Sequence, residues 1–148
     1  MDAKIRDVLA QKSPRVWTVA ASDRVGDAAE LMLEKGIGAV VVLEGDRLLG
    51  VLDERDILAE VTVNGREPWM VRVGDLVERH ALVTIHPDQT ITDAITLMTD
   101  RRRRHLPVCI KERLLGVISI GDLVKCMGEP SSPDALRPPT PKLGRYVA

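Results

Sequence analysis

The sequence predicts a mixed fold of helices and strands (α+β) that is built from two β-α-β-β-α repeats. Residues 18–61 recur at residues 84–127 with a constant offset of 66 positions, and the segment RLLGV stands in both copies. Within each copy, apolar β-branched runs alternate with stretches of helical periodicity. A fixed period means that one unit is used twice, and neither copy is long enough to bury a good core alone. We therefore expect the copies to pack on each other, with function in the groove between them.

The elements of the first repeat follow from apolar periodicity and from turn signals. Ile5, Val8 and Leu9 predict a short helix within residues 1–11. Gly36 stands where a helix would stop. The remaining prediction is a strand at 16–19, a helix at 25–35, strands at 38–43 and 47–52, and a helix at 53–61.

The second repeat has the same predicted order, with a linker before it and a tail after it. Its elements are expected at residues 83–85, 91–100, 105–110, 113–118 and 119–127, and a short helix is expected at 73–77. The expected domains are a first repeat with its N-terminal helix at 1–63, a linker at 64–81, a second repeat at 82–128 and a mobile tail at 129–148. The tail prediction rests on five prolines between residues 130 and 141.

Composition excludes several classes of function. The net charge is −1, and the chain has no Phe, one Tyr and two Trp, so neither a basic field nor a set of stacking rings favours nucleic acid. No apolar stretch reaches the roughly 18 residues of a membrane span, and the first residues lack the apolar segment of a secretion signal. Cys109 and Cys126 are expected to be structural thiols in a reducing compartment. These observations predict a cytoplasmic protein without membrane or nucleic-acid partners.

Each repeat ends in a strand, a glycine, a turn and a helix that carries an acid three residues in. The two segments are Asp53-x-x-Asp56 and Ser119-x-x-Asp122. A helix N-terminus suits phosphate, and the second carboxylate of each segment can accept two hydrogen bonds from a ribose diol. The same spacing also describes a helix-capping box. Both interpretations stay open, because two helices need two caps whether or not a ligand binds.

The stretch from residue 5 to residue 127 resembles a tandem pair of CBS domains (cystathionine-β-synthase domains), of the stand-alone bacterial type. The resemblance lies in TVAASDRVGDAAELMLEKGIGAVVVLEGDRLLGVLDERDIL and in TIHPDQTITDAITLMTDRRRRHLPVCIKERLLGVISIGDLV. It implies two β-α-β-β-α units related by a pseudo-twofold axis, with facing sheets. It also implies two clefts, built crosswise from both repeats, for adenosine-containing ligands such as AMP, ADP, ATP or NAD, and less so S-adenosylmethionine.

The family's binding positions carry over residue by residue. In cleft one the resemblance implies Asp56 for the ribose beside Asp53 and Arg55, adenine contacts from Leu82 and Val83, and phosphate contacts from Arg102, Arg104 and His105 just before Pro107. In cleft two it implies Ser119, Gly121 and Asp122, opposite Val16, Trp17, Thr18, Ile37, Gly38 and Ala39.

Two departures keep the clefts unranked. Asp53 replaces the family's Ser or Thr and repels phosphate unless the arginines compensate. Cleft two keeps Ser119 but has Gly38 and Ala39 where cleft one has Arg104 and His105. The arginine run at 101–104 has a solvated helix end as its default interpretation, a phosphate clamp as the second and a nucleic-acid patch as the third.

The favoured function is a regulatory module that senses an adenine nucleotide, as an energy or redox-state sensor for an unknown partner protein. The alternative is a structural or oligomerisation module with vestigial clefts. An enzyme is not favoured, because the sequence holds no nucleophile–base pair, metal constellation or Walker-type loop, and His80 and His86 are expected to be surface loop residues. We also expect a homodimer through outward helical faces, formed by Leu31, Met32, Leu97, Met98, Leu123 and Val124.

Overall fold

The first repeat forms a three-stranded sheet with helices on its outer side. A computed structural model describes residues 2–128, so the predicted tail at 129–148 lies outside the described residues. β1 pairs parallel with β2, and β2 pairs antiparallel with β3. The elements are β1 (Thr18–Ala20), α2 (Val25–Lys35), β2 (Ala39–Glu44), β3 (Arg47–Asp53) and α3 (Glu54–Leu58), which continues as the π-helical turn Ala59–Val63.

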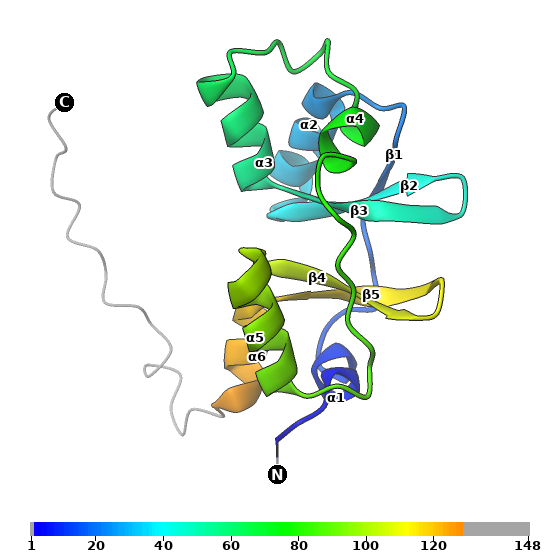
Figure 1. Ribbon diagram of the computed structural model, residues 1–148, viewed down its shortest axis with the longest axis vertical. Coiled ribbons are helices and arrows are strands. Elements are labelled where there is room, and N and C mark those ends of the chain that lie inside the picture. The colour runs from blue at the N-terminus through cyan, green and yellow to red at the C-terminus, as the bar shows by residue number, and fades with distance from the viewer. Residues whose placement is uncertain (1, 129–148) are drawn as a thin grey trace, which may run out of the picture.

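The second repeat has the same order around a two-stranded sheet. Its elements are α5 (Ile91–Arg101), β4 (His105–Ile110), β5 (Arg113–Ser119) and α6 (Ile120–Met127), and the chain also contains α1 (Ile5–Ala10) and α4 (Val73–Val77). The two sheets face each other across the middle of the molecule, with helices outside them (Figure 1). The register shifts at corresponding places in the two sheets, after Val42 and after Val108. The predicted α+β class is confirmed.

The strand expected at residues 83–85 is reduced to one parallel bridge, and two prolines explain the difference. In the first repeat the backbone N–H groups of Val41 and Ala21 hold β1 against β2, with hydrogen bonds of 3.0 and 2.8 Å. The residues 66 positions later are Pro107 and Pro87. Because proline has no backbone N–H, neither hydrogen bond can form in the second repeat.

The N-terminal helix packs on the second repeat, although it precedes the first repeat in the chain. Ile5 and Val8 of α1 are buried in the core of the second repeat. Val73 and Leu76 of α4 are buried in the core of the first. Each repeat therefore receives its short helix from the segment that precedes the other repeat, and the chain crosses between the sheets at residues 11–17 and again after α4.

The glycine of the repeated RLLGV segment lets these short helices approach the sheets. A Cβ atom on Gly50 would lie 2.7 Å from Cγ1 of Val77 in α4. A Cβ atom on Gly116 would lie 2.9 Å from Cδ2 of Leu9 in α1. Such contacts are too short for a side chain. Glycine at this position therefore allows α4 and α1 to pack closely against the sheets.

The helical faces expected to mediate dimerisation mostly point inward. Met32, Met98 and Leu123 are buried, and Leu31 and Leu97 pack against them. Each apolar stripe therefore covers its own sheet, as the stripe of an amphipathic helix does. Of the six residues only Val124 is exposed, and the other large apolar side chains exposed on α3 and α6 are Leu58, Ile120 and Met127.

Candidate functional site

Both helices that begin at the centre of the molecule start with a complete capping box. The Asp53 side chain accepts the Asp56 N–H at 2.9 Å, and the Asp56 side chain accepts the Asp53 N–H at 3.0 Å. At α6 the Ser119 hydroxyl accepts the Asp122 N–H at 3.1 Å, and the Asp122 side chain accepts the Ser119 N–H at 2.8 Å. The capping interpretation is confirmed for both segments, and each carboxylate keeps an oxygen lone pair for another group.

Cleft one, between β3, the linker and β4, is nearly filled by side chains. Its volume is about 30 Å³, far below the roughly 300 Å³ at which small-molecule sites begin. It brings together several residues that the resemblance implied. Its lining includes Asp53, Leu82, Val83, His105 and Pro107, together with Val77, His80 and Arg103.

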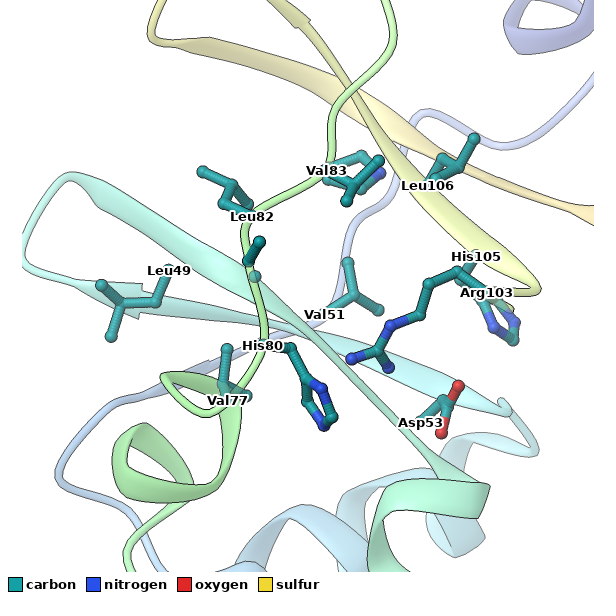
Figure 2. Close-up of a pocket in the computed structure, with 13 residues that line it drawn as sticks. Leu49, Val51, Asp53, Val77, His80, Leu82, Val83, Arg103, His105 and Leu106 are labelled. Carbon is teal, nitrogen blue, oxygen red and sulfur yellow. The ribbon is translucent and has the colours of Figure 1, made fainter. Parts of the chain in front are cut away.

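Arg103 occupies the polar end of cleft one. Its Nη1 atom lies 3.2 Å from both carboxylate oxygens of Asp56. His80 Nε2 lies 3.7 Å from Asp56 Oδ1. Figure 2 shows the Arg103 side chain extending across the cleft toward Asp53. The carboxylate that should meet a ribose therefore already has a cationic partner. His80 is an exposed loop residue, as expected, and it also lines the cleft.

Asp53 disfavours the charged form of its neighbour Asp56. Burial raises the pKa of Asp56, and the nearby Asp53 adds to the increase, while the backbone hydrogen bond from Asp53 and the charge of Arg103 lower it. Asp53 is itself buried. Arg103 is the cation that offsets this pair, which explains why the guanidinium is drawn into the cleft.

The other arginines do not line cleft one. Arg102, which was expected to contact phosphate, ends α5 in the left-handed conformation with φ 53° and is exposed. Arg55 and Arg104 are also exposed and lie outside the lining. The left-handed residue reverses the chain, so the next arginine enters the cleft. The run of four arginines indicated a possible phosphate contact, but nothing in it distinguished Arg103 as the member that points into the cleft.

Cleft two is an open cavity of about 480 Å³ on the other side of the paired sheets. Small-molecule sites span about 300–1,000 Å³. Its lining includes seven of the predicted residues, namely Val16, Trp17, Ile37, Gly38, Ala39, Ser119 and Asp122. Thr18 and Gly121 are exposed and lie outside this lining.

Lys12 is a cleft-two residue that the sequence analysis missed. Its Nζ atom donates hydrogen bonds to the Val117 carbonyl at 2.6 Å and to Asp122 Oδ2 at 2.7 Å. Burial raises the pKa of Asp122, but the hydrogen bonds from Lys12 and Ser119 outweigh burial and leave that pKa below its ordinary value. Lys12 reaches this carboxylate only because the chain crosses between repeats, which no local pattern signals.

Two further cations lie at Trp17, on the opposite wall of cleft two. The Arg15 guanidinium carbon is 5.2 Å from the Trp17 ring centroid, and Lys35 Nζ is 4.7 Å from it. These are cation–π distances. Cleft two has Gly38 and Ala39 where cleft one was expected to have basic residues, but Lys12 and Arg15 bring positive charge to its lining.

His105 lines both clefts and connects them physically. Its Nδ1 atom is buried without a hydrogen-bond partner among the described residues. Burial lowers the pKa of His105, against the raising effect of Asp53 and Asp122. The imidazole is therefore favoured in its neutral form at the base of the two clefts.

Comparisons with known proteins agree on one family. The family model "CBS domain" matches residues 5–62 and 73–129. The chain is 38% identical over 109 residues to "CBS domain-containing protein CBSX3, mitochondrial" of Arabidopsis thaliana, covering 71% of this chain and 53% of that protein. It is 33% identical over 123 residues to "CBS domain-containing protein YhcV" of Bacillus subtilis, covering 82% of this chain and 86% of that protein. The chain thus spans about half the length of the Arabidopsis relative.

Solved structures share the same arrangement. A protein with CBS domains from Burkholderia ambifaria MC40-6 has a TM-score of 0.81 at 36% identity, covering 88% of this chain and 97% of that one. A hexameric CBS-CP12 protein from bloom-forming cyanobacteria has a TM-score of 0.69 at 28% identity, covering 82% of this chain and 69% of that one. Relatives of this chain therefore form oligomers.

Two structural features bear on other kinds of site. Within residues 2–128, no cluster of three or more His, Cys, Asp or Glu side chains could hold a metal ion. The helices of this part of the chain are also too short or too polar to cross a membrane.

Proposed function

The chain belongs to the CBS-domain family, whose paired domains are generally regulatory modules, and we propose that it binds an adenosine-containing nucleotide in cleft two. The observation that carries the proposal is the contrast between the two clefts. Cleft two offers about 480 Å³, whereas cleft one offers about 30 Å³ and holds Arg103 against Asp56. A nucleoside fits only the larger space.

The chemistry of cleft two suits a nucleotide at both ends. Trp17, Ile37 and the strand entry supply apolar surface for a base. Asp122 supplies carboxylate oxygens for ribose hydroxyls, and the N-terminus of α6 favours negative charge. Lys12 and Arg15 add positive charge for phosphate. The candidate ligands are AMP, ADP, ATP and NAD, with S-adenosylmethionine less favoured because it carries no phosphate.

Regulation then needs no catalytic group. Cleft two has walls from both repeats, so a ligand that contacts both walls favours one arrangement of the facing sheets over others. A partner protein that prefers that arrangement reads the occupancy of the cleft. We propose this role in the cytoplasm, as a homodimer whose contact includes the exposed apolar side chains of α3 and α6.

A structural or oligomerisation module is the second candidate. The small volume of cleft one supports it, because Arg103 there pairs with Asp56, the residue expected to bind a ribose. The hexameric cyanobacterial relative supports it as well. In this case cleft two would bind no nucleotide at physiological concentration.

Calorimetric titration of the full chain with AMP, ADP, ATP and NAD separates the two candidates. The test variant is Asp122→Ala, and the matched control is Asp93→Ala, because Asp93 closes the same kind of capping box at α5 outside both clefts. The proposal predicts binding that Asp122→Ala weakens about tenfold or more and Asp93→Ala leaves unchanged. No binding of any of the four ligands would favour the structural module.

A further inference from the structure

Lys12 holds the two acceptors that form the polar edge of cleft two. Its ammonium lies 2.6 Å from the Val117 carbonyl oxygen and 2.7 Å from Asp122 Oδ2. Asp122 Oδ2 also accepts the Ser119 N–H. A ribose that approaches Asp122 therefore meets a carboxylate with one oxygen already used by a backbone N–H and by a cation.

We propose that Lys12 determines which ligands cleft two accepts, by pairing with Asp122 in the empty cleft and with the phosphate of a bound nucleotide. This inference rests on the proposed function. Lysine suits such an exchange, because it is a compact charge on a flexible four-carbon stem. Lys12 lies in the segment between α1 and β1, outside any helix or strand, and its side chain is 32% exposed.

The exchange discriminates between phosphorylated and unphosphorylated ligands. A ligand that binds Asp122 through Oδ2 must share or replace the contact that Lys12 makes. A nucleotide returns an anionic partner to the ammonium, so the lost ion pair is replaced by another charge-assisted contact. Adenosine returns none, and it leaves Lys12 with a carbonyl alone. Cleft two is thereby selective for phosphorylated nucleosides. It has this selectivity although no run of arginines precedes β2 as the run at 101–104 precedes β4.

A competing explanation gives Lys12 a purely structural role. In that case the ion pair would only fasten the crossing segment to the second repeat. Loss of Lys12 would then lower the stability of the protein and weaken all ligands by the same factor. The pattern across ligands, rather than the loss itself, distinguishes the two roles.

The test measures dissociation constants of adenosine, AMP and ATP for the full chain and for Lys12→Met and Lys12→Gln. Lys125→Met is the matched control, because Lys125 is exposed on α6 and lies outside both cleft linings. We expect the wild type and Lys125→Met to prefer AMP and ATP over adenosine. In both Lys12 variants this preference should fall about tenfold, with adenosine bound more tightly than by the wild type.

Two results would overturn the inference, and they differ. If the wild type binds the nucleotides but both Lys12 variants keep its preference, Lys12 does not set selectivity, while the proposed function stands. If the wild type binds none of the three ligands, the proposed function fails and the inference fails with it. Melting temperatures of all four proteins, measured in parallel, show whether each variant is folded.

Discussion

At the scale of single residues, the two capping carboxylates differ in what neutralises them. Asp56 faces Asp53 and is held by Arg103, whereas Asp122 faces the uncharged Ser119 and is held by Lys12. A second acid therefore needs a permanent guanidinium in cleft one. A single acid needs only a lysine that can leave. This difference of one residue, Asp53 against Ser119, accompanies the difference in volume between the two clefts.

Arg102 gives a prediction about strain at the end of α5. It has φ 53°, and Gly36 has φ 62° at the corresponding end of α2. The left-handed conformation costs a non-glycine residue about 1–2 kcal/mol. Arg102→Gly should therefore raise the free energy of unfolding by about 0.5–1 kcal/mol in denaturant titrations, after the entropy that glycine adds to the unfolded chain.

The neighbouring arginine is the control for Arg102→Gly. Arg101→Gly removes the same charge from a helical position, so it should lower the free energy of unfolding by about 0.5 kcal/mol. AMP affinity should stay unchanged in Arg102→Gly, because Arg102 lies outside both cleft linings. A tenfold loss of AMP affinity would instead restore Arg102 to the phosphate contact that the resemblance implied.

His105 gives a prediction about pH. Burial holds its pKa below the ordinary value of 6.5. The unfolded chain therefore binds more protons than the folded chain between that lowered pKa and 6.5, and the free energy of unfolding falls as the pH drops through this window. His105→Gln should remove this part of the slope, which is at most about 1.4 kcal/mol per pH unit. Urea titrations of both proteins at several pH values measure it. Parallel curves for the two proteins would show that His105 has an ordinary pKa.

At the scale of elements, the exchanged short helices hold the repeats together. The Val73 N–H donates to the Asp23 carbonyl at 2.8 Å, and the Ile5 N–H donates to the Gln89 carbonyl at 2.9 Å. Each repeat thus contains a helix that the chain can supply only by crossing to the other sheet. The crossing also places Lys12 in cleft two and His80 in cleft one, so the connections that stabilise the fold also shape both sites.

The contact between α4 and β3 gives a prediction about packing. Gly50→Ala would place its Cβ atom 2.7 Å from Cγ1 of Val77, a β-branched side chain with little freedom to move. We expect a loss of about 1–3 kcal/mol in the free energy of unfolding. The control is Gly121→Ala, where the nearest atom is 3.6 Å away. Equal stability of the two alanine variants would mean that α4 can shift without cost.

At the scale of the whole molecule, α3 and α6 lie on the same side of the two repeats (Figure 1). Leu58 and Val124 are 61% and 51% exposed on these helices. Exposed apolar side chains on the outer elements suit a closed twofold dimer. Light scattering of the 16.3 kDa chain should give twice that mass. The double change Leu58→Glu and Val124→Glu should give the monomer, whereas Leu33→Glu, on an 85% exposed residue of α2, should not. A wild-type protein that scatters light as a monomer would contradict the proposed dimer.

The repeated elements could be predicted from the sequence because they depend on local signals. Helix α2 ends at Gly36, and the turns, buried strands and capping acids lie where periodicity and spacing put them. The missing strand before α5 was also readable in principle, since Pro87 and Pro107 remove the donors. The resemblance also predicted most of the residues that line cleft two, because the binding positions of the family recur with the repeat.

The remaining features depend on contacts between residues far apart in the chain. Lys12 and Asp122 are 110 positions apart, and Arg103 and Asp56 are 47 apart. Neither pair obeys the 66-residue offset, so the repeat cannot reveal them. The inward arginine is set by the left-handed turn at Arg102, which a run of four identical side chains conceals. The volumes of the two clefts also depend on packing between distant segments, so the sequence did not predict them.

The stoichiometry of AMP binding tests most directly the claim that cleft two alone is the nucleotide site. Calorimetry of the full chain should give one AMP per chain. Asp56→Ala should retain this binding, because Asp56 is engaged by Arg103 in the filled cleft, and Asp122→Ala should weaken it about tenfold or more. Two AMP molecules per chain, or binding lost with Asp56→Ala and kept with Asp122→Ala, would contradict the assignment.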